Sequence, residues 1–181
     1  MFARTPRLTL RPAWPEDAPA LTAAIADDRV VRMLTRVPHP YALADAEGWI
    51  ARPRGGHDPR FVIVAHDGGE PRLIGGIGID DADGTANLGY WLTPAAWGRG
   101  YATEAGRAVI DMARHALPLD RVDAWHFADN PASGRVLRKL GFRPTGRTLA
   151  KHSVARPDPA TSIEYTLDLA EDDRAPMPIA A

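Results

Sequence analysis

The stretch Asn87-Leu-Gly-Tyr-Trp-Leu-Thr-Pro-Ala-Ala-Trp-Gly-Arg-Gly-Tyr-Ala-Thr-Glu104 decides how this 181-residue chain folds. It opens with aromatic and aliphatic residues typical of a β-strand, and Pro94 ends that strand because proline has no N–H to donate. Two glycines then bracket Arg99, and from Ala102 onward apolar residues recur at helical spacing. A strand, a glycine-rich loop and a helix start in succession can bind phosphate, since loop N–H groups and the helix dipole converge there.

The composition is that of an ordinary globular domain. Charged residues make up 25% of the chain, hydrophobic residues 45%, and the formal net charge is −1. This balance gives no electrostatic reason to expect nucleic acid or an anionic membrane as a partner. The chain has no cysteine, which excludes disulfides, thiolate metal ligands and an acyl-cysteine intermediate. With no apolar run long enough for a bilayer or a secretion signal, we expect a cytoplasmic protein.

The order of predicted elements indicates one α/β domain over residues 1–169, followed by a disordered tail at 170–181. Alternating or apolar segments predict strands at 8–10, 61–65, 73–79, 87–92, 122–127, 142–149 and 162–169. Helical spacing and capping residues predict helices at 15–26, 28–34, 43–51, 100–117 and 130–141. We therefore expect a mixed, mostly antiparallel central sheet of about seven strands flanked by helices.

Three sequence blocks together resemble one known family. They are Gly89-Tyr-Trp-Leu92 continued by Trp97-Gly-Arg-Gly-Tyr-Ala-Thr-Glu-Ala105, then Asn130-Pro-Ala-Ser-Gly-Arg-Val-Leu-Arg-Lys-Leu-Gly-Phe142, and the opening Thr5-Pro-Arg-Leu-Thr-Leu-Arg-Pro12. In this order they resemble the GNAT N-acetyltransferases, and within them the RimJ/RimL-like branch, which acetylates protein N-termini and other amines. The resemblance covers about residues 5–169. It implies the acyl-CoA N-acyltransferase fold, with a sheet splayed between its fourth and fifth strands.

The resemblance implies acetyl-CoA as co-substrate, with its pantetheine arm beside the 88–92 strand end and its pyrophosphate at the loop and helix start. The expected cofactor-binding residues are Leu92, Thr93, Trp97, Gly98, Arg99, Gly100, Tyr101, Ala102, Thr103, Asn130, Ser133 and Lys139. Trp97 stands where the family usually has Gln or Arg, which removes one polar contact near the phosphates. Arg138 and Lys139 fit either the nucleotide end or a solvated helix face. The six histidines are scattered without ligand spacing, so we expect no metal.

Candidate catalytic residues cluster in the second block. Asn130 before Pro131 is a good helix N-cap whatever the function, and the family also uses it near the pantetheine arm. In the resembling branch the serine at Ser133 protonates the departing thiolate, whereas many other members use a tyrosine where this chain has Leu137. No base is evident, because the glutamate that some relatives carry is replaced here by Asn87. His152 is the candidate base, His39 and His126 are the other candidates, and water could relay the proton to His152 or to a backbone carbonyl.

The apparent lack of a carboxylate base bears on the acceptor. At pH 7.4 an α-amine is about a quarter neutral, whereas a lysine amine is neutral in about one part in a thousand. We therefore expect an N-acetyltransferase acting on a protein or peptide N-terminal α-amine, as a monomer or homodimer. A small-molecule amine (polyamine, amino acid or antibiotic) and a non-catalytic acyl-CoA-binding module are the alternatives. The expected acceptor-side residues are Tyr90, His39, Tyr41 and His126.

Overall fold

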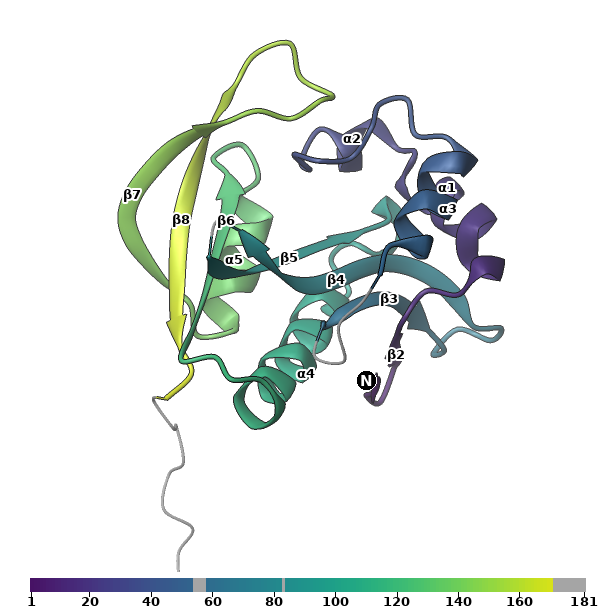
Figure 1. Ribbon diagram of the computed structural model, residues 1–181, viewed down its shortest axis with the longest axis horizontal. Coiled ribbons are helices and arrows are strands. Elements are labelled where there is room, and N and C mark those ends of the chain that lie inside the picture. The colour runs from purple at the N-terminus through teal and green to yellow at the C-terminus, as the bar shows by residue number, and fades with distance from the viewer. Residues whose placement is uncertain (54–57, 83, 171–181) are drawn as a thin grey trace, which may run out of the picture.

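The computed structural model describes residues 1–53, 58–82 and 84–170. These form a single sheet in the order β1-β2-β3-β4-β5-β6-β8-β7, with helices on both faces (Figure 1). The strands are β1 (Ala3–Arg4), β2 (Leu8–Arg11), β3 (Arg60–Ala65), β4 (Arg72–Ala82), β5 (Thr85–Leu92), β6 (Arg121–Phe127), β7 (Arg143–Lys151) and β8 (Ala160–Asp168). The helices are α1 (Ala18–Ile25), α2 (Asp28–Val31), α3 (Leu43–Ala51), α4 (Tyr101–Ala116) and α5 (Pro131–Lys139), with 3₁₀ turns η1 (Pro15–Asp17) and η2 (Pro94–Ala96).

The sheet is antiparallel except where β5 meets β6. Those two strands are parallel and pair only at Asn87 with Asp123 and at Leu88 with Ala124. Beyond Leu88 they separate, so among the described residues the end of β5 through Leu92 has no strand partner on that side. The expected mixed, mostly antiparallel sheet, splayed after the strand that ends at Leu92, is confirmed.

The part of the chain that the structure describes has eight strands, where the sequence predicted about seven. The additional strand is β1, whose two residues pair with Leu10 and Thr9 of β2. Two residues are too few to produce an alternating pattern, which is why the sequence did not predict this strand. The predicted helix at 15–26 is divided into η1 and α1, and the one at 28–34 ends at Val31.

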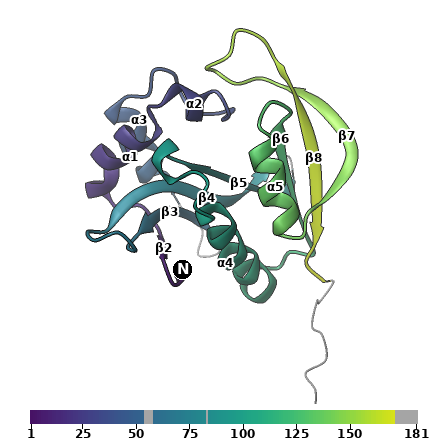
Figure 2. The ribbon, with the colours of Figure 1, turned by 180° about the vertical axis from the view of Figure 1, so that it is seen from behind.

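Helices α4 and α5 cover one face of the sheet (Figure 2). The apolar stripe of α4, with Ala105, Val109 and Ala113 fully buried, packs into a core shared with Leu88 of β5 and Val122 of β6. Helix α4 approaches α5 closely at Gly106, where a Cβ would lie 2.5 Å from a methyl carbon of Leu140. Gly106 therefore sets the distance between the two helices.

Helices α1 and α3 cover the opposite face. Leu21 and Ala46 are buried there and pack with the partly buried Trp49 and Trp91. Alternation along β5 explains the division, because Leu88 and Leu92 belong to the core under α4 while Trp91 points to the other side. An ion pair joins β2 to the turn that precedes α1, because Arg11 on β2 lies 2.6 Å from Asp17 of η1.

Two sequence expectations concern the ends and surroundings of the domain. Apart from Ala170, the predicted tail at 170–181 lies outside the described residues. Among the residues that the structure describes, none of the helices has both the length and the apolar character required to span a membrane.

Candidate active site

A cleft with a volume of about 1500 Å³ opens where β5 and β6 separate. Its lining includes the start of α4, the first turns of α5 and the facing ends of β5 and β6. On the other side of the sheet it continues between α2, α3 and the end of β7. Cavities for one small ligand usually measure about 300–1000 Å³. This cleft therefore has room for two ligands that meet through the opening in the sheet.

The loop before α4 has the geometry of an anion-binding site. Gly98 and Gly100 have φ angles of 74° and 80°, a left-handed region that favours glycine. Within the described residues, the backbone N–H groups of residues 98–103 have no hydrogen-bond acceptor. They lie at the N-terminus of a 16-residue helix, whose dipole adds positive potential. These residues fit a diphosphate group such as that of acetyl-CoA.

The loop is fixed from behind by polar contacts, those to Glu104 partly buried. Glu104 accepts hydrogen bonds from the hydroxyl of Thr5 at 2.6 Å and from Nε of Arg7 at 2.8 Å. Burial alone would raise the pKa of Glu104, but these hydrogen bonds lower it below the usual value. Arg7 also donates to the carbonyl of Arg99 at 3.0 Å. The contacts hold both ends of the loop in one conformation.

Tyr101 supplies a second anchor. Its ring is fully buried, and its hydroxyl donates to both carboxylate oxygens of Asp67, at 2.8 and 2.7 Å. This hydrogen bond lowers the pKa of Asp67, and burial raises the pKa of Tyr101. The guanidinium of Arg99 lies 5.0 Å from the centre of the Tyr101 ring and 3.8 Å from Asp67. Arg99 therefore binds behind the loop rather than lining the cleft.

Most of the expected cofactor-binding residues line the cleft. Of the whole set, only Thr93 and Arg99 do not. The indole N–H of Trp97 donates to the carbonyl oxygen of Leu92 at 2.8 Å. This tryptophan thus joins the anion-binding loop to the free end of β5 through its indole N–H, a group that Gln and Arg lack.

The start of α5 brings two hydroxyl groups together. Asn130 is the N-cap, as predicted, and its Oδ1 accepts from the N–H of Ser133 at 3.3 Å. The Ser133 hydroxyl lies 2.7 Å from the hydroxyl of Tyr90 on β5. Burial raises the pKa of Tyr90 to about 12, so its phenol stays protonated at neutral pH. Leu137, where many family members have a tyrosine, is buried in the core.

The expected histidines lie in different places. His126 on β6 is buried beside α5 and lines the cleft; its Nδ1 lies 2.7 Å from the carbonyl oxygen of Phe127. Nε2 of His126 has no hydrogen-bond partner among the described residues. His152 is exposed and lines the cleft after β7. His39 does not line it and lies 3.8 Å from Asp28.

The floor of the cleft between β5 and α3 is formed by glycine. Gly76, Gly78 and Gly89 lie on adjacent strands in register, and all three line the cleft. A Cβ at Gly89 would meet no atom within 4 Å, so this position opens into free space. Tyr41 and Trp91 line the same region, and burial raises the pKa of Tyr41.

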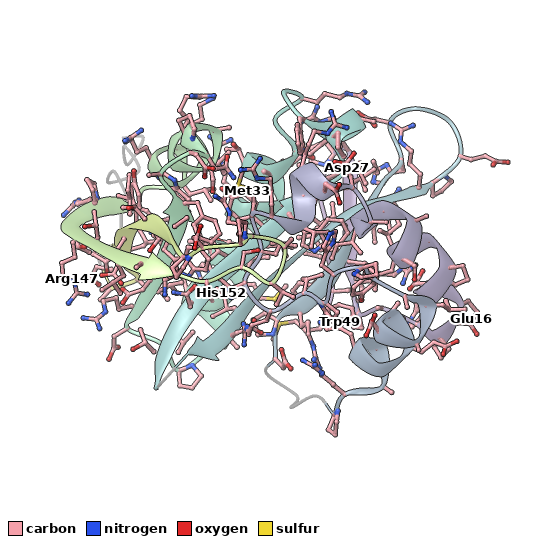
Figure 3. The ribbon with its side chains drawn as sticks, turned by 90° about the horizontal axis from the view of Figure 1, so that it is seen from above. Glu16, Asp27, Met33, Trp49, Arg147 and His152 are labelled. Atoms are coloured by element: carbon pink, nitrogen blue, oxygen red, sulfur yellow. The ribbon has the colours of Figure 1, made fainter. Side chains whose placement is uncertain are left out.

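The loop between β7 and β8, residues 152–159, covers this part of the cleft and is called the roof below. Arg156, whose side chain is 10% exposed, donates to the carbonyl of Arg32 at 2.7 Å and to Asp129 at 3.0 Å. The hydroxyl of the buried Ser153 reaches the carbonyl of Val31 at 3.4 Å. Seen from above, His152 and Trp49 lie between the outer residues Glu16 and Arg147 (Figure 3). The roof therefore joins the last hairpin to α2.

Sequence reasoning did not identify Arg7, Glu104, Asp67 or Arg156 as site-supporting residues. Arg7 and Glu104 stand inside two of the quoted blocks, so charged residues of opposite sign in those blocks were the available signal. Asp67 and Arg156 lie in turns and loops, where no pattern marks them. Their role depends on contacts with residues more than thirty positions away along the chain.

Comparisons with known proteins identify the family. A family model described as an acetyltransferase (GNAT) domain matches residues 7–143. An N-acetyltransferase of Bacillus subtilis, YoaA, is 32% identical over 148 residues, covering 78% of this chain and 82% of YoaA. The chain therefore belongs to the GNAT acetyltransferases. Members of this family are acyltransferases that use acetyl-CoA, and the expected family and donor are confirmed.

The solved structures that share this fold include two with a bound coenzyme. The microcin C7 self-immunity acetyltransferase MccE, in complex with acetyl-CoA and AMP, has a TM-score of 0.75 at 19% identity, covering 91% of this chain and 93% of its own. RimL, a ribosomal L7/L12 α-N-protein acetyltransferase in complex with coenzyme A, has a TM-score of 0.77 at 17% identity, covering 93% and 98%. At these identities the likeness concerns the fold.

In the described part of the chain, no group of three or more His, Asp or Glu residues is placed to hold a metal.

Proposed function

We propose that this protein transfers the acetyl group of acetyl-CoA directly to the α-amine of a protein or peptide N-terminus. Direct transfer is supported by the cleft, which is open on both sides of the sheet and large enough for donor and acceptor together. Holding an amine against a thioester in this way replaces a bimolecular encounter with an oriented one. No cysteine is present to carry the acetyl group.

Acetyl-CoA has a matching site on the α4 and α5 side. The free N–H groups of residues 98–103 would bind its pyrophosphate, and the unpaired end of β5 through Leu92 would pair with its pantetheine arm. Ser133 would give a proton to the departing thiolate. Lys139 is exposed on α5 and lines the cleft, so it is available to the nucleotide end.

The preference for an α-amine rests on the state of the carboxylates in the cleft. Its described lining contains Asp45, Asp80 and Asp129. Asp45 accepts the N–H of Ala42, Asp80 is paired with Arg36, and Asp129 is paired with Arg156. Each of these three carboxylates is engaged with a donor, so none is free to take a proton from an ammonium group, and an acceptor that arrives largely neutral is favoured. An α-amine meets this condition better than a lysine side chain by about 3 kcal/mol.

The charge of the lining argues against a polyamine. Against these three carboxylates the lining has eight cationic side chains, namely Arg29, Arg32, Arg36, Arg52, Arg60, Arg135, Lys139 and Lys151. A cleft with this excess of positive charge repels a polycation. This charge argues against a polyamine, whereas the choice between an α-amine and a lysine amine depends on the carboxylates.

A small amine that also bears a negative charge is the second candidate. The Lys151 ammonium lies 4.9 Å from the centre of the Trp125 ring, which puts a cation and an aromatic surface together on the wall of the cleft. Such a wall suits an acceptor with an aromatic or anionic group, and MccE, which shares the fold, binds AMP.

The test is a panel of amines with acetyl-CoA, scored by thiol release. It includes peptides with a free α-amine and no lysine, the same peptides N-terminally blocked and carrying one lysine, a polyamine, a free amino acid and an amine linked to a nucleoside monophosphate. We expect the highest kcat/KM for the free α-amine peptides. A clear preference for the polyamine would overturn the proposal, and a preference for the nucleotide-linked amine would establish the second candidate. Binding of coenzyme A is measured in parallel.

A further inference from the structure

The hydroxyl groups of Tyr90 and Ser133 form the closest polar contact on the wall of the cleft between β5 and α5. Their oxygen atoms are 2.7 Å apart, and the Tyr90 hydroxyl also lies 3.2 Å from the backbone carbonyl oxygen of Ser133. The Tyr90 hydroxyl has no other hydrogen-bond partner among the described residues. Both residues line the cleft, so a ligand at the opening of the sheet can reach this pair.

Two hydrogen-bond arrangements satisfy these distances. In the first, Ser133 donates to Tyr90 and Tyr90 donates to the Ser133 carbonyl, so both hydrogen atoms are used within the protein. In the second, Tyr90 donates to the Ser133 hydroxyl oxygen, and the Ser133 hydrogen is free to point into the cleft. Each hydroxyl can donate one hydrogen and accept others, so the two arrangements differ only by rotation of the O–H bonds.

We propose that Tyr90 is the positioning residue for Ser133, and that a switch between these two arrangements delivers the Ser133 proton to the leaving sulfur. A sulfur that gains negative charge attracts the Ser133 hydrogen, and the Tyr90 hydrogen then moves from the carbonyl to the Ser133 oxygen. This inference rests on the proposed function. The sequence predicts Tyr90 only as an acceptor-side residue, whereas this inference gives it a role on the side of the leaving group.

The chemistry of an alcohol explains why Ser133 needs a partner. An alcohol is far less acidic than a thiol, whose usual pKa is about 8.5. Ser133 can protonate a thiolate only if the negative charge that develops on its own oxygen is stabilised. A phenol that donates to that oxygen stabilises the charge as it forms. Burial raises the pKa of Tyr90 to about 12, so the phenol keeps its hydrogen over the whole neutral range.

The reaction balances without another reactant. The amine nitrogen forms a bond to the acetyl carbon, the carbon–sulfur bond breaks, and sulfur takes the proton of Ser133. The amine nitrogen loses one proton to water as the amide forms, and Ser133 regains a proton from water in the cleft while Tyr90 keeps its own hydrogen and its hydrogen bond to the Ser133 oxygen. The products are the N-acetylated amine and the free thiol.

A double-mutant cycle tests the proposal with the amine that gives the highest rate. The variants are Tyr90→Phe, Ser133→Ala and their combination, with Tyr165→Phe as a matched control that removes a phenol hydroxyl from a buried tyrosine outside the cleft lining. We expect Tyr90→Phe to lower kcat about tenfold, the size of one lost hydrogen bond, and to change the coenzyme A dissociation constant less than twofold. Tyr165→Phe should leave kcat within twofold.

The combined variant decides between positioning and independent roles. If Tyr90 acts only through Ser133, the combination is no slower than Ser133→Ala alone. Multiplied losses, or an unchanged kcat in Tyr90→Phe, would overturn the inference. A parallel rise in the coenzyme A dissociation constant and fall in melting temperature would also overturn it, because those belong to a structural role. A wild-type protein that releases no thiol with any amine would instead refute the proposed function.

Discussion

Gly134 on α5 lies directly against the imidazole of His126 on β6. A Cβ at Gly134 would lie 2.5 Å from Nε2 and 3.2 Å from Cε1 of that ring, closer than non-bonded atoms approach. The ring has little freedom to move, because its Nδ1 bonds to the carbonyl of Phe127 and its face packs on Tyr165. Since Ser133 precedes Gly134, this contact sets the distance from the Ser133 hydroxyl to the sheet.

Gly134→Ala should therefore displace α5 as well as destabilise the fold. Overpacking of a rigid contact costs about 1–3 kcal/mol, and we expect the free energy of unfolding to fall by this amount in urea. The displacement should separate Ser133 from Tyr90 and lower kcat at least tenfold, measured by thiol release. Gly48→Ala on α3 is the control, because its Cβ would meet nothing within 4 Å. It should raise stability by about 0.5–1 kcal/mol. Equal stability of the two variants would show that His126 moves freely.

The anion-binding loop can be tested by a pair of glycines with the same backbone strain. Gly98 has φ 74° and Gly146 on β7 has φ 82°, and a Cβ added at either glycine would meet no atom within 4 Å. Alanine in this region costs about 1–2 kcal/mol at either position. Only Gly98→Ala should weaken coenzyme A binding, by tenfold or more in isothermal titration calorimetry, because it changes where the loop N–H groups point. Comparable affinities in the two variants would mean that the loop does not bind the cofactor.

The parts of the fold that depend on local signals could be predicted from sequence. Pro94, the paired glycines and the apolar spacing of α4 act through neighbouring residues, and Asn130 caps α5 through its own helix. These signals place the loop and the two helices that flank the opening in the sheet.

The parts that depend on distant contacts could not. The guanidinium of Arg99 lies behind the loop beside Asp67, and no local pattern around Arg99 indicates this contact with a residue in a distant turn. The Tyr90–Ser133 contact likewise joins residues 43 positions apart. Such pairs follow from strand register and helix packing, which a single sequence does not specify.

The carboxylate of Glu104 should make stability depend on pH. Its pKa is lowered in the folded protein, so the unfolded chain binds the proton more tightly. The stabilisation is present above the usual pKa of 4.5 and is lost as the pH falls through the lower folded value. Glu104→Gln should reduce the free energy of unfolding by about 1–3 kcal/mol at pH 7 and flatten its decline between pH 5 and pH 3.

Melting temperatures across this pH range measure the effect. Glu16→Gln is the matched control, because Glu16 is exposed and makes no ion pair among the described residues (Figure 3). It should leave both the melting temperature and its acid slope within error of the wild type. If Glu104→Gln keeps the wild-type slope, the Glu104 carboxylate does not contribute to the pH dependence of stability.

The roof over the cleft should open when Arg156 is shortened. Lysine at this position keeps the positive charge but lacks the planar guanidinium, whose Nε and Nη2 donate separately to the carbonyl of Arg32 and to Asp129. We expect Arg156→Lys to increase hydrogen exchange of residues 152–159 at least tenfold and to raise the KM of the acceptor more than that of acetyl-CoA. Arg147→Lys changes an exposed ion pair with Glu164 on the same hairpin and should alter neither. If exchange at residues 152–159 stays at the wild-type rate, Ser153 rather than Arg156 holds the roof to α2.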